Sequence, residues 1–167
     1  GGMAAVGLRE PMLALANQYD MVRTGACVGL YPDLPDGRLD RATPEAPRER
    51  YRIAEPVPSA CYPGTEAAFA AAVVAVQRMR APGADTFRAL RHVGLLKLAV
   101  AALAVIILAV AFWPFPAAAL LHGLTVLVVL GDPVVSLWLQ TLYAEFPILL
   151  GIYMVVGALV AALLRDA

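Results

Sequence analysis

The stretch Gly94–Trp113, "GLLKLAVAALAVIILAVAFW", decides the fold of this chain of 167 residues. Its twenty residues carry one charge, Lys97, close to the start. A helix needs about 20 consecutive apolar residues to cross a bilayer, so the stretch predicts a transmembrane helix. The basic side chains at its entry, Arg88, Arg91 and Lys97, are expected to reach the lipid headgroups, and Trp113 is expected to mark the far interface.

The composition agrees with a membrane protein. The chain is 60% hydrophobic and 16% charged, against about 45–50% and 25% for a typical soluble domain. The net charge is zero, which gives no electrostatic basis for binding nucleic acid. Twelve of the thirteen basic residues and ten of the thirteen acidic ones lie in residues 1–97. We therefore expect an all-α integral membrane protein, with a loop-rich cytoplasmic or peripheral segment over 1–84 and a transmembrane domain over 85–167.

The first segment shows two helical patterns. Apolar residues recur at helical spacing over 11–24, and the Ala-rich stretch 65–80 is capped in the sequence by Thr65. Seven prolines fall between residues 31 and 64, which predicts extended loop there. A short edge strand around Tyr51 and Ile53 fits the alternation of that part. Asp85 or Thr86 is expected to cap the following helix.

A further span is predicted over 147–165, with Arg165 as its anchor. Gly157 and Ala161 form a pair of small residues four apart, which either lets two helices approach closely or is ordinary helix filler. Between the two spans lies 117–143, too long and too interrupted for one straight helix. Two to three transmembrane helices are therefore expected, the middle one broken.

The break is expected at Gly131-Asp132-Pro133. Glycine is a common helix terminator, aspartate a preferred N-cap and proline a preferred first helical residue. If the break lies at the membrane surface, Asp132 is a cap, and Trp138 lies at headgroup level in an interfacial helix. If it lies in mid-bilayer, Asp132, with Glu145, becomes a candidate for an ion or substrate path. His122 is expected to bond a backbone carbonyl of a neighbouring helix, with a proton relay as the alternative.

The two cysteines, Cys27 and Cys61, are expected to be free, buried thiols. The basic residues before the first span favour a cytoplasmic N-terminal segment, and the cytoplasm keeps thiols reduced. One disulfide is the alternative if the segment faces an oxidising compartment. With two His far apart, the chain offers too few ligands for a zinc site, so no metal and no cofactor are expected.

The sequence contains no Gly-rich phosphate loop, HExxH, GxSxG or CxxC motif. The leading hypothesis is a non-catalytic subunit of a larger bacterial inner-membrane complex for secretion, transport or energy conversion. Its expected partners are the lipid bilayer and other membrane-protein subunits, with no nucleic acid and with a homo-oligomer possible. A small homo-oligomeric channel or transporter with Asp132 on the path is the alternative, and a membrane-anchored enzyme ranks third.

Overall fold

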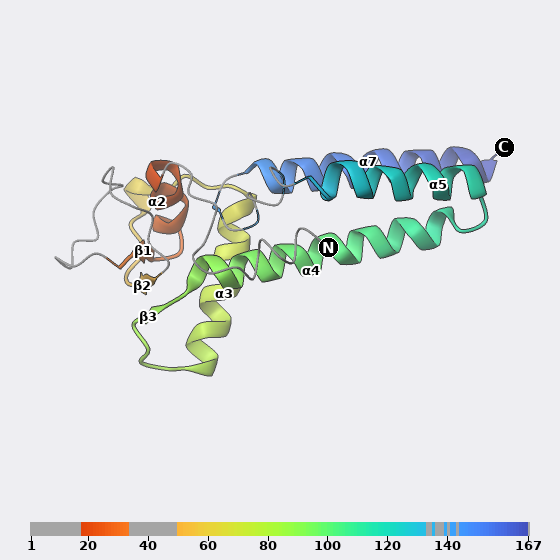
Figure 1. The fold of residues 1–167 in the computed structure, drawn as a ribbon. Coiled ribbons are helices and arrows are strands. Elements are labelled where there is room, and N and C mark those ends of the chain that lie inside the picture. The colour runs from red at the N-terminus through yellow and green to blue at the C-terminus, as the bar shows by residue number, and fades with distance from the viewer. Residues whose placement is uncertain are drawn as a thin grey trace.

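The computed structural model describes residues 18–33, 50–132, 135, 139, 141–142 and 144–166. Figure 1 shows an elongated molecule in which a small head lies at one end of a bundle of long helices. The head consists of α2, three short strands and α3. The bundle consists of α4, α5 with its extension η2, and α7. The C-terminus lies at the end of the bundle far from the head, beside the turn between α4 and α5 (Figure 1).

The head contains two α-helices, a single 3₁₀ turn and three strands in its described part. Their bounds are α2 Gln18–Ala26, β1 Leu30–Pro32, β2 Tyr51–Ile53, η1 Pro58–Ala60, α3 Thr65–Arg80 and β3 Thr86–Phe87. The first helix continues to Ala26, past the end expected from the sequence, and residues 11–17 of the expected helix lie outside the described part.

The three strands form an antiparallel sheet in the order β1-β2-β3, in which Leu30 pairs with Ile53 and Tyr51 with Phe87. The chain is therefore mostly helical but not all-α, which corrects the sequence-based expectation. The strand at Tyr51 was expected at an edge, and it lies in the middle instead. Each strand has only two or three residues, too few for alternation to mark it in the sequence.

Gly29 directs the chain from α2 into the sheet. Its φ is +73°, and a side chain there would collide with the carbonyl oxygen of Ala54. The amide of Ala54 donates to the carbonyl of Gly29 at 2.8 Å, which fastens the turn to β2. Gly25, near the end of α2, does not have a positive φ.

The helix starts differ from the expected caps. Gly64 is the N-cap of α3, so Thr65 is its first residue and makes no capping hydrogen bond. The next helix, α4, begins at Ala89 after Arg88, because Thr86 forms part of β3 instead of a cap. Arg88, the N-cap of α4, makes no side-chain capping hydrogen bond.

The bundle is formed by α4 Ala89–Phe112, α5 Pro116–Thr125, η2 Val126–Leu130 and α7 Glu145–Asp166. In Figure 1, α5 runs back along α4, and α7 runs beside both. Two of these helices, α4 and α7, are long and apolar enough to cross a membrane. The segment α5–η2 is apolar but shorter. The helix break after residue 130 was expected, and Pro116 begins α5 as its first residue.

The end of the middle helix is π-helical. The amide of Gly131 donates to the carbonyl of Val126 at 3.0 Å, five residues back. Gly131 has a φ of −81°, so it does not end the helix in the left-handed conformation expected for a terminating glycine. Its small size matters for another reason: a Cβ there would collide with the carbonyl oxygen of Leu127.

The apolar core of the head is shared with the bundle. Met21, Leu30, Tyr51 and Phe87 pack with Val73 and Val74 of α3, and with Leu90, Val93 and Leu142 from the bundle side. Further along, Ala101 and Ala104 of α4 pack on Phe146 and Leu150 of α7. The head therefore has no core that is independent of α4.

Candidate functional site at the junction of head and bundle

A buried ion pair lies where α3 crosses the first turns of α4. The Nζ atom of Lys97 lies 2.9 Å from Oε1 of Glu66 and donates to the carbonyl oxygen of Thr141 at 2.7 Å. It also lies 5.6 Å from the ring centre of Phe146. The side chains of Lys97 and Glu66 are 0% and 2% exposed, so the pair is cut off from solvent. One lysine thus ties α4 to α3, to the segment before α7 and to α7 itself.

This position corrects the expectation that Lys97 reaches the lipid headgroups. Its place on the helix explains why: Val93, Lys97, Ala101, Ala104 and Leu108 share the buried face of α4. On that face the ammonium meets the head instead of the surface. Charge pairing and a carbonyl acceptor offset the cost of burying it.

Glu66 was not among the site residues expected from the sequence. A signal existed, because Glu66 shares the buried stripe of α3 with Ala70, Val73 and Val74 at helical spacing. An acidic residue on the apolar stripe of one helix and a lysine on that of the next indicate a buried pair.

The carboxyl group of Glu66 is incompletely satisfied. Among the described residues no hydrogen-bond donor reaches its buried Oε2 atom. Burial raises the pKa of this carboxyl to about 7, with Lys97 lowering it and the charge of Glu145 raising it. The carboxyl group of Glu66 therefore holds a proton more readily than an exposed glutamate does.

A cavity of about 350 Å³ adjoins the pair, between α2, the segment before α3 and the start of α7. Arg23, Thr24 and Tyr62 line it from the head, while Glu66 and Glu145 bring carboxyl groups. The guanidinium of Arg23 lies 5.2 Å from the ring centre of Tyr62. Of the site residues expected from the sequence, Glu145 lines this cavity. It is exposed and begins α7.

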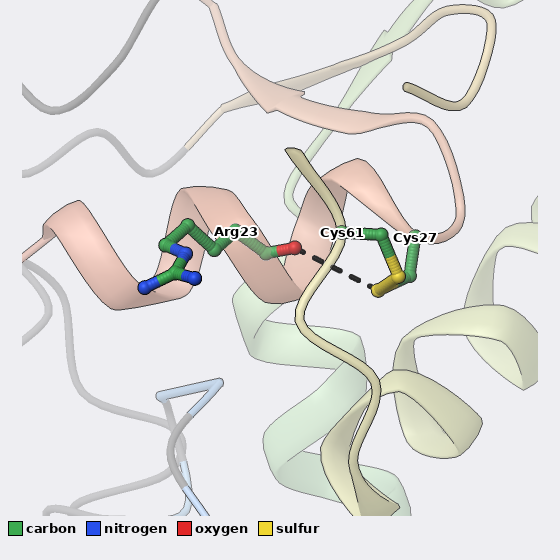
Figure 2. The surroundings of a disulfide bond; sticks show 3 residues. All are labelled: Arg23, Cys27 and Cys61. Atoms are coloured by element: carbon green, nitrogen blue, oxygen red, sulfur yellow. Dashed lines mark hydrogen bonds between the residues drawn. A yellow bond between two sulfur atoms is a disulfide. The ribbon is translucent and has the colours of Figure 1, made fainter. Parts of the chain in front are cut away.

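The wall of the cavity on the head side is fixed by a disulfide between Cys27 and Cys61. The bond joins the end of α2 to the segment before α3 (Figure 2). The Cys27 sulfur also lies 3.7 Å from the carbonyl oxygen of Arg23, the contact drawn as a dashed line in Figure 2. The expectation of two free thiols is thus wrong. It rested on a cytoplasmic placement. In the structure, the amides of Val57 and Tyr62 donate to the carbonyls of Ala26 and Arg23, and the two cysteines lie at a Cα distance of 4.6 Å.

The remaining candidate residues lie elsewhere on the bundle. Asp132 is exposed just after η2. Pro133 and Val134, which would begin the helix that Asp132 caps, lie outside the described residues, as does Trp138. At the ends of the two long helices, Arg88, Trp113 and Arg165 are exposed, and Arg91 is half-buried.

His122 lies between α5 and its neighbours. Its Nε2 atom is 2.6 Å from the hydroxyl oxygen of Tyr153 in α7, and its ring lies 5.6 Å from that of Phe112 in α4. The expected partner was a backbone carbonyl, so a side-chain hydroxyl takes its place. The residues around this pair line a second, mostly apolar cavity of about 380 Å³ that opens between α5 and α7.

Gly157 and Ala161 both lie on the face of α7 that contacts α4. A Cβ at Gly157 would come within 2.5 Å of a terminal methyl group of Leu108, and Ala161 packs with Leu108 and Phe112. This contact is within the chain. Within the described ranges no three His, Cys, Asp or Glu side chains are grouped so as to hold a metal ion.

No family model matches the chain, and neither a curated protein nor a solved structure matches it.

Proposed function

We propose that this chain is a non-catalytic integral-membrane subunit that packs on partner subunits in a larger bacterial inner-membrane complex for secretion, transport or energy conversion. The observation that carries the proposal is the apolar outer surface of the bundle. Large aliphatic side chains are exposed along all three helices, among them Leu103, Ile106 and Val110 on α4, Leu120, Leu124 and Leu127 on α5–η2, and Ile152, Val155, Leu159 and Leu163 on α7.

Such a surface is costly in water. Exposed apolar area costs about 25 cal/mol per Å², and soluble monomers rarely expose patches of more than a few hundred Å². In a bilayer the same side chains contact lipid tails. The turn at Trp113 fits this placement, since its ring is exposed at the end of α4, where aromatic residues lie at the membrane–water interface.

The length of the middle helix supports partners in addition to lipid. The fifteen residues of Pro116–Leu130 span about 22 Å at 1.5 Å per residue. This is less than the roughly 30 Å of a hydrocarbon core. Backbone groups just past its end must therefore be covered by protein, because lipid offers them no hydrogen bonds. We infer that neighbouring subunits provide part of this cover.

Extraction in a mild detergent, followed by native mass spectrometry, tests this proposal. A subunit of a larger complex is expected to appear with other chains in fixed stoichiometry. Assemblies that contain only copies of this chain would contradict the proposal. They would support a homo-oligomeric channel or transporter, for which the exposed carboxylate of Asp132 beside a helix end is the favourable observation.

We also propose that the head faces the oxidising side of the membrane. Basic residues near the start of α4 favour a cytoplasmic location for the head. Lys97, however, is buried and adds nothing to the surface charge at this end of the helix. Structural disulfides persist in oxidising compartments, and long N-terminal segments cross membranes largely regardless of charge. The disulfide is therefore a stronger indication of the side on which the head lies than the arginines near the start of α4.

An impermeant maleimide applied to spheroplasts tests this orientation. The cysteines are expected to react only after an impermeant reductant has opened the bond, and without lysis. If the cysteines are labelled only after lysis and without a reductant, the proposed orientation is wrong: the head is then cytoplasmic, and Cys27 and Cys61 are free thiols.

A further inference from the structure

The helix α3 is apolar on the side that faces away from the rest of the molecule. Its residues 67–76 are all apolar, so no side of the helix is polar over this length. One side is covered, because Ala70, Val73 and Val74 are buried in the core that the head shares with α4. A helix that is apolar all round is normally buried on every side, in protein or in a membrane. The exposed apolar side chains of α3, which form its outward face, are Ala68, Ala71, Ala72, Ala75, Val76 and Met79.

The free end of this face carries the larger side chains. Val76 is 42% exposed and Met79 is 75% exposed. A long, flexible thioether side chain such as that of Met79 can adapt to an irregular apolar surrounding. The outward face therefore requires a cover that reaches as far as the last turn of α3.

The position of α3 indicates which cover is at hand. Its buried side chains pack on Ala89, Leu90 and Val93, in the first turns of α4. Figure 1 shows α3 running across the axis of the bundle, with its C-terminal end projecting to one side. In the membrane placement proposed above, on which this inference rests, the first turns of α4 lie at the boundary between headgroups and acyl chains. A helix that crosses α4 at this depth lies along the boundary and turns its outward face sideways into it.

The charges at the end of α3 indicate the kind of lipid. Arg78 and Arg80 are both exposed in the last turn. Because each residue turns the helix by about 100°, they lie on the two flanks of Met79. From Arg78 to Arg91 the chain contains four arginines and one acidic residue, Asp85, which leaves a net charge of +3. Basic side chains that flank an apolar helical face are typical of helices bound to anionic membranes, and a guanidinium pairs well with a phosphate.

We propose that α3 is an interfacial helix whose outward face inserts among anionic phospholipids. The aliphatic side chains contact the upper part of the acyl chains, and the guanidinium groups of Arg78 and Arg80 reach the lipid phosphates. The head is thereby held against the membrane by α3 in addition to α4 and α7.

Nitroxide labels on single cysteine variants of the full chain in nanodiscs test the position of the face. Met79→Cys reports on α3, Val155→Cys on the exposed side of α7 and Ser59→Cys on the exposed turn η1 of the head. Wild-type protein taken through the same labelling without reductant gives the background from Cys27 and Cys61. Collision with oxygen, which dissolves in lipid, is compared with collision with a water-soluble nickel chelate.

The label at Met79 is expected to collide more with oxygen than with the nickel chelate, as the label at Val155 does, whereas the label at Ser59 shows the reverse. Collision of the Met79 label with the chelate as frequent as at Ser59 would place the face in water and overturn the proposal. Protection from both agents would also overturn it, because the cover would then be protein, either a partner or a second copy. If the label at Val155 also lies in water, the membrane placement itself fails, which separates that failure from one confined to α3.

The choice of lipid is tested in nanodiscs that contain equal amounts of phosphatidylglycerol and phosphatidylcholine, with the lipids retained by the chain read by native mass spectrometry. Enrichment of phosphatidylglycerol is expected, and Arg78→Gln and Arg80→Gln should each lower it roughly fivefold. Arg50→Gln removes the same charge from an exposed arginine beside β2 and is the matched control. Equal retention of both lipids by the wild type, or an equal loss in the Arg50→Gln control, would overturn the assignment to anionic lipid.

Discussion

The ion pair between Glu66 and Lys97 holds three elements together at one point. Removal of one charged side chain is expected to destabilise the fold more than removal of both. Lys97→Met leaves a buried carboxylate without its counter-charge, which costs about 3–5 kcal/mol. The double variant Glu66→Gln/Lys97→Met should recover much of that loss. Thermal unfolding in detergent, followed by circular dichroism, measures both. A double variant less stable than Lys97→Met would show that the pair contributes more than it costs to bury.

The raised pKa of Glu66 predicts a dependence of stability on pH. Because the pKa of about 7 in the folded chain lies above the ordinary value of 4.5, the folded state binds the proton more tightly than the unfolded state. The contribution of Glu66 protonation to the free energy of unfolding is therefore complete below pH 4.5 and is lost as the pH rises through about 7. The unfolding midpoint of the wild type should fall over this window more than that of Glu66→Gln. Parallel curves for the two proteins would assign the pH dependence to other groups.

Asp132 follows the π-helical turn and is expected to act as a helix cap. Asp132→Asn should be mild because an amide oxygen accepts the same hydrogen bond. Asp132→Ala should cost about 0.5–2 kcal/mol, seen as a lower yield of assembled complex. Quantitative blotting of the purified assembly compares the variants. Normal assembly of Asp132→Asn with loss of transport activity would instead support a conduction path through this residue.

At the scale of elements, the head depends on the helix that follows it. A fragment of residues 1–81 lacks β3, the first turns of α4 and Leu142, all of which contribute to the core of the head. Ordering each residue costs about 1–2 kcal/mol of backbone entropy, and the remaining apolar contacts are too few to offset it. The fragment should show no cooperative thermal transition by circular dichroism, while the full chain does. A sharp transition in the fragment would mean that its core is self-sufficient.

The elements could be predicted from the sequence where a long periodic pattern or a proline marked them. The helix over 65–80 and the apolar stretch 94–113 are of this kind. The first coincides with α3, and the second lies within α4 except for its last residue, Trp113. The three-stranded sheet could not be predicted, because each strand is held by partners distant in the sequence: Leu30 pairs with Ile53, and Tyr51 with Phe87.

The candidate site was predictable only in part, for the same reason. Glu145 was singled out as a charge in an apolar region. The roles of the other groups follow from how α2, α3 and α7 pack together, and no local sequence pattern predicts that packing. These groups are Glu66, Arg23 and the disulfide. Lys97 was singled out in the sequence as a charge at the start of the first span, but the direction of its side chain depends on which face of α4 the head covers.

At the scale of the whole molecule, the structure separates two kinds of surface. The head carries its charges on a small, disulfide-linked fold, while the bundle exposes aliphatic side chains along its length. The head and the C-terminus lie at opposite ends of the bundle (Figure 1). If α4, α5–η2 and α7 all cross the bilayer, the head and the C-terminus face opposite sides of the membrane.

Flotation of carbonate-washed membranes on a density gradient tests the central claim, that α4 and α7 lie within a bilayer. Alkaline carbonate removes peripheral proteins, and flotation separates membranes from aggregates. We expect the chain to rise with the lipid and to be released only by detergent. Release of the chain into the carbonate supernatant, or its recovery at the bottom of the gradient, would contradict a membrane-embedded bundle and would require another cover for its apolar faces.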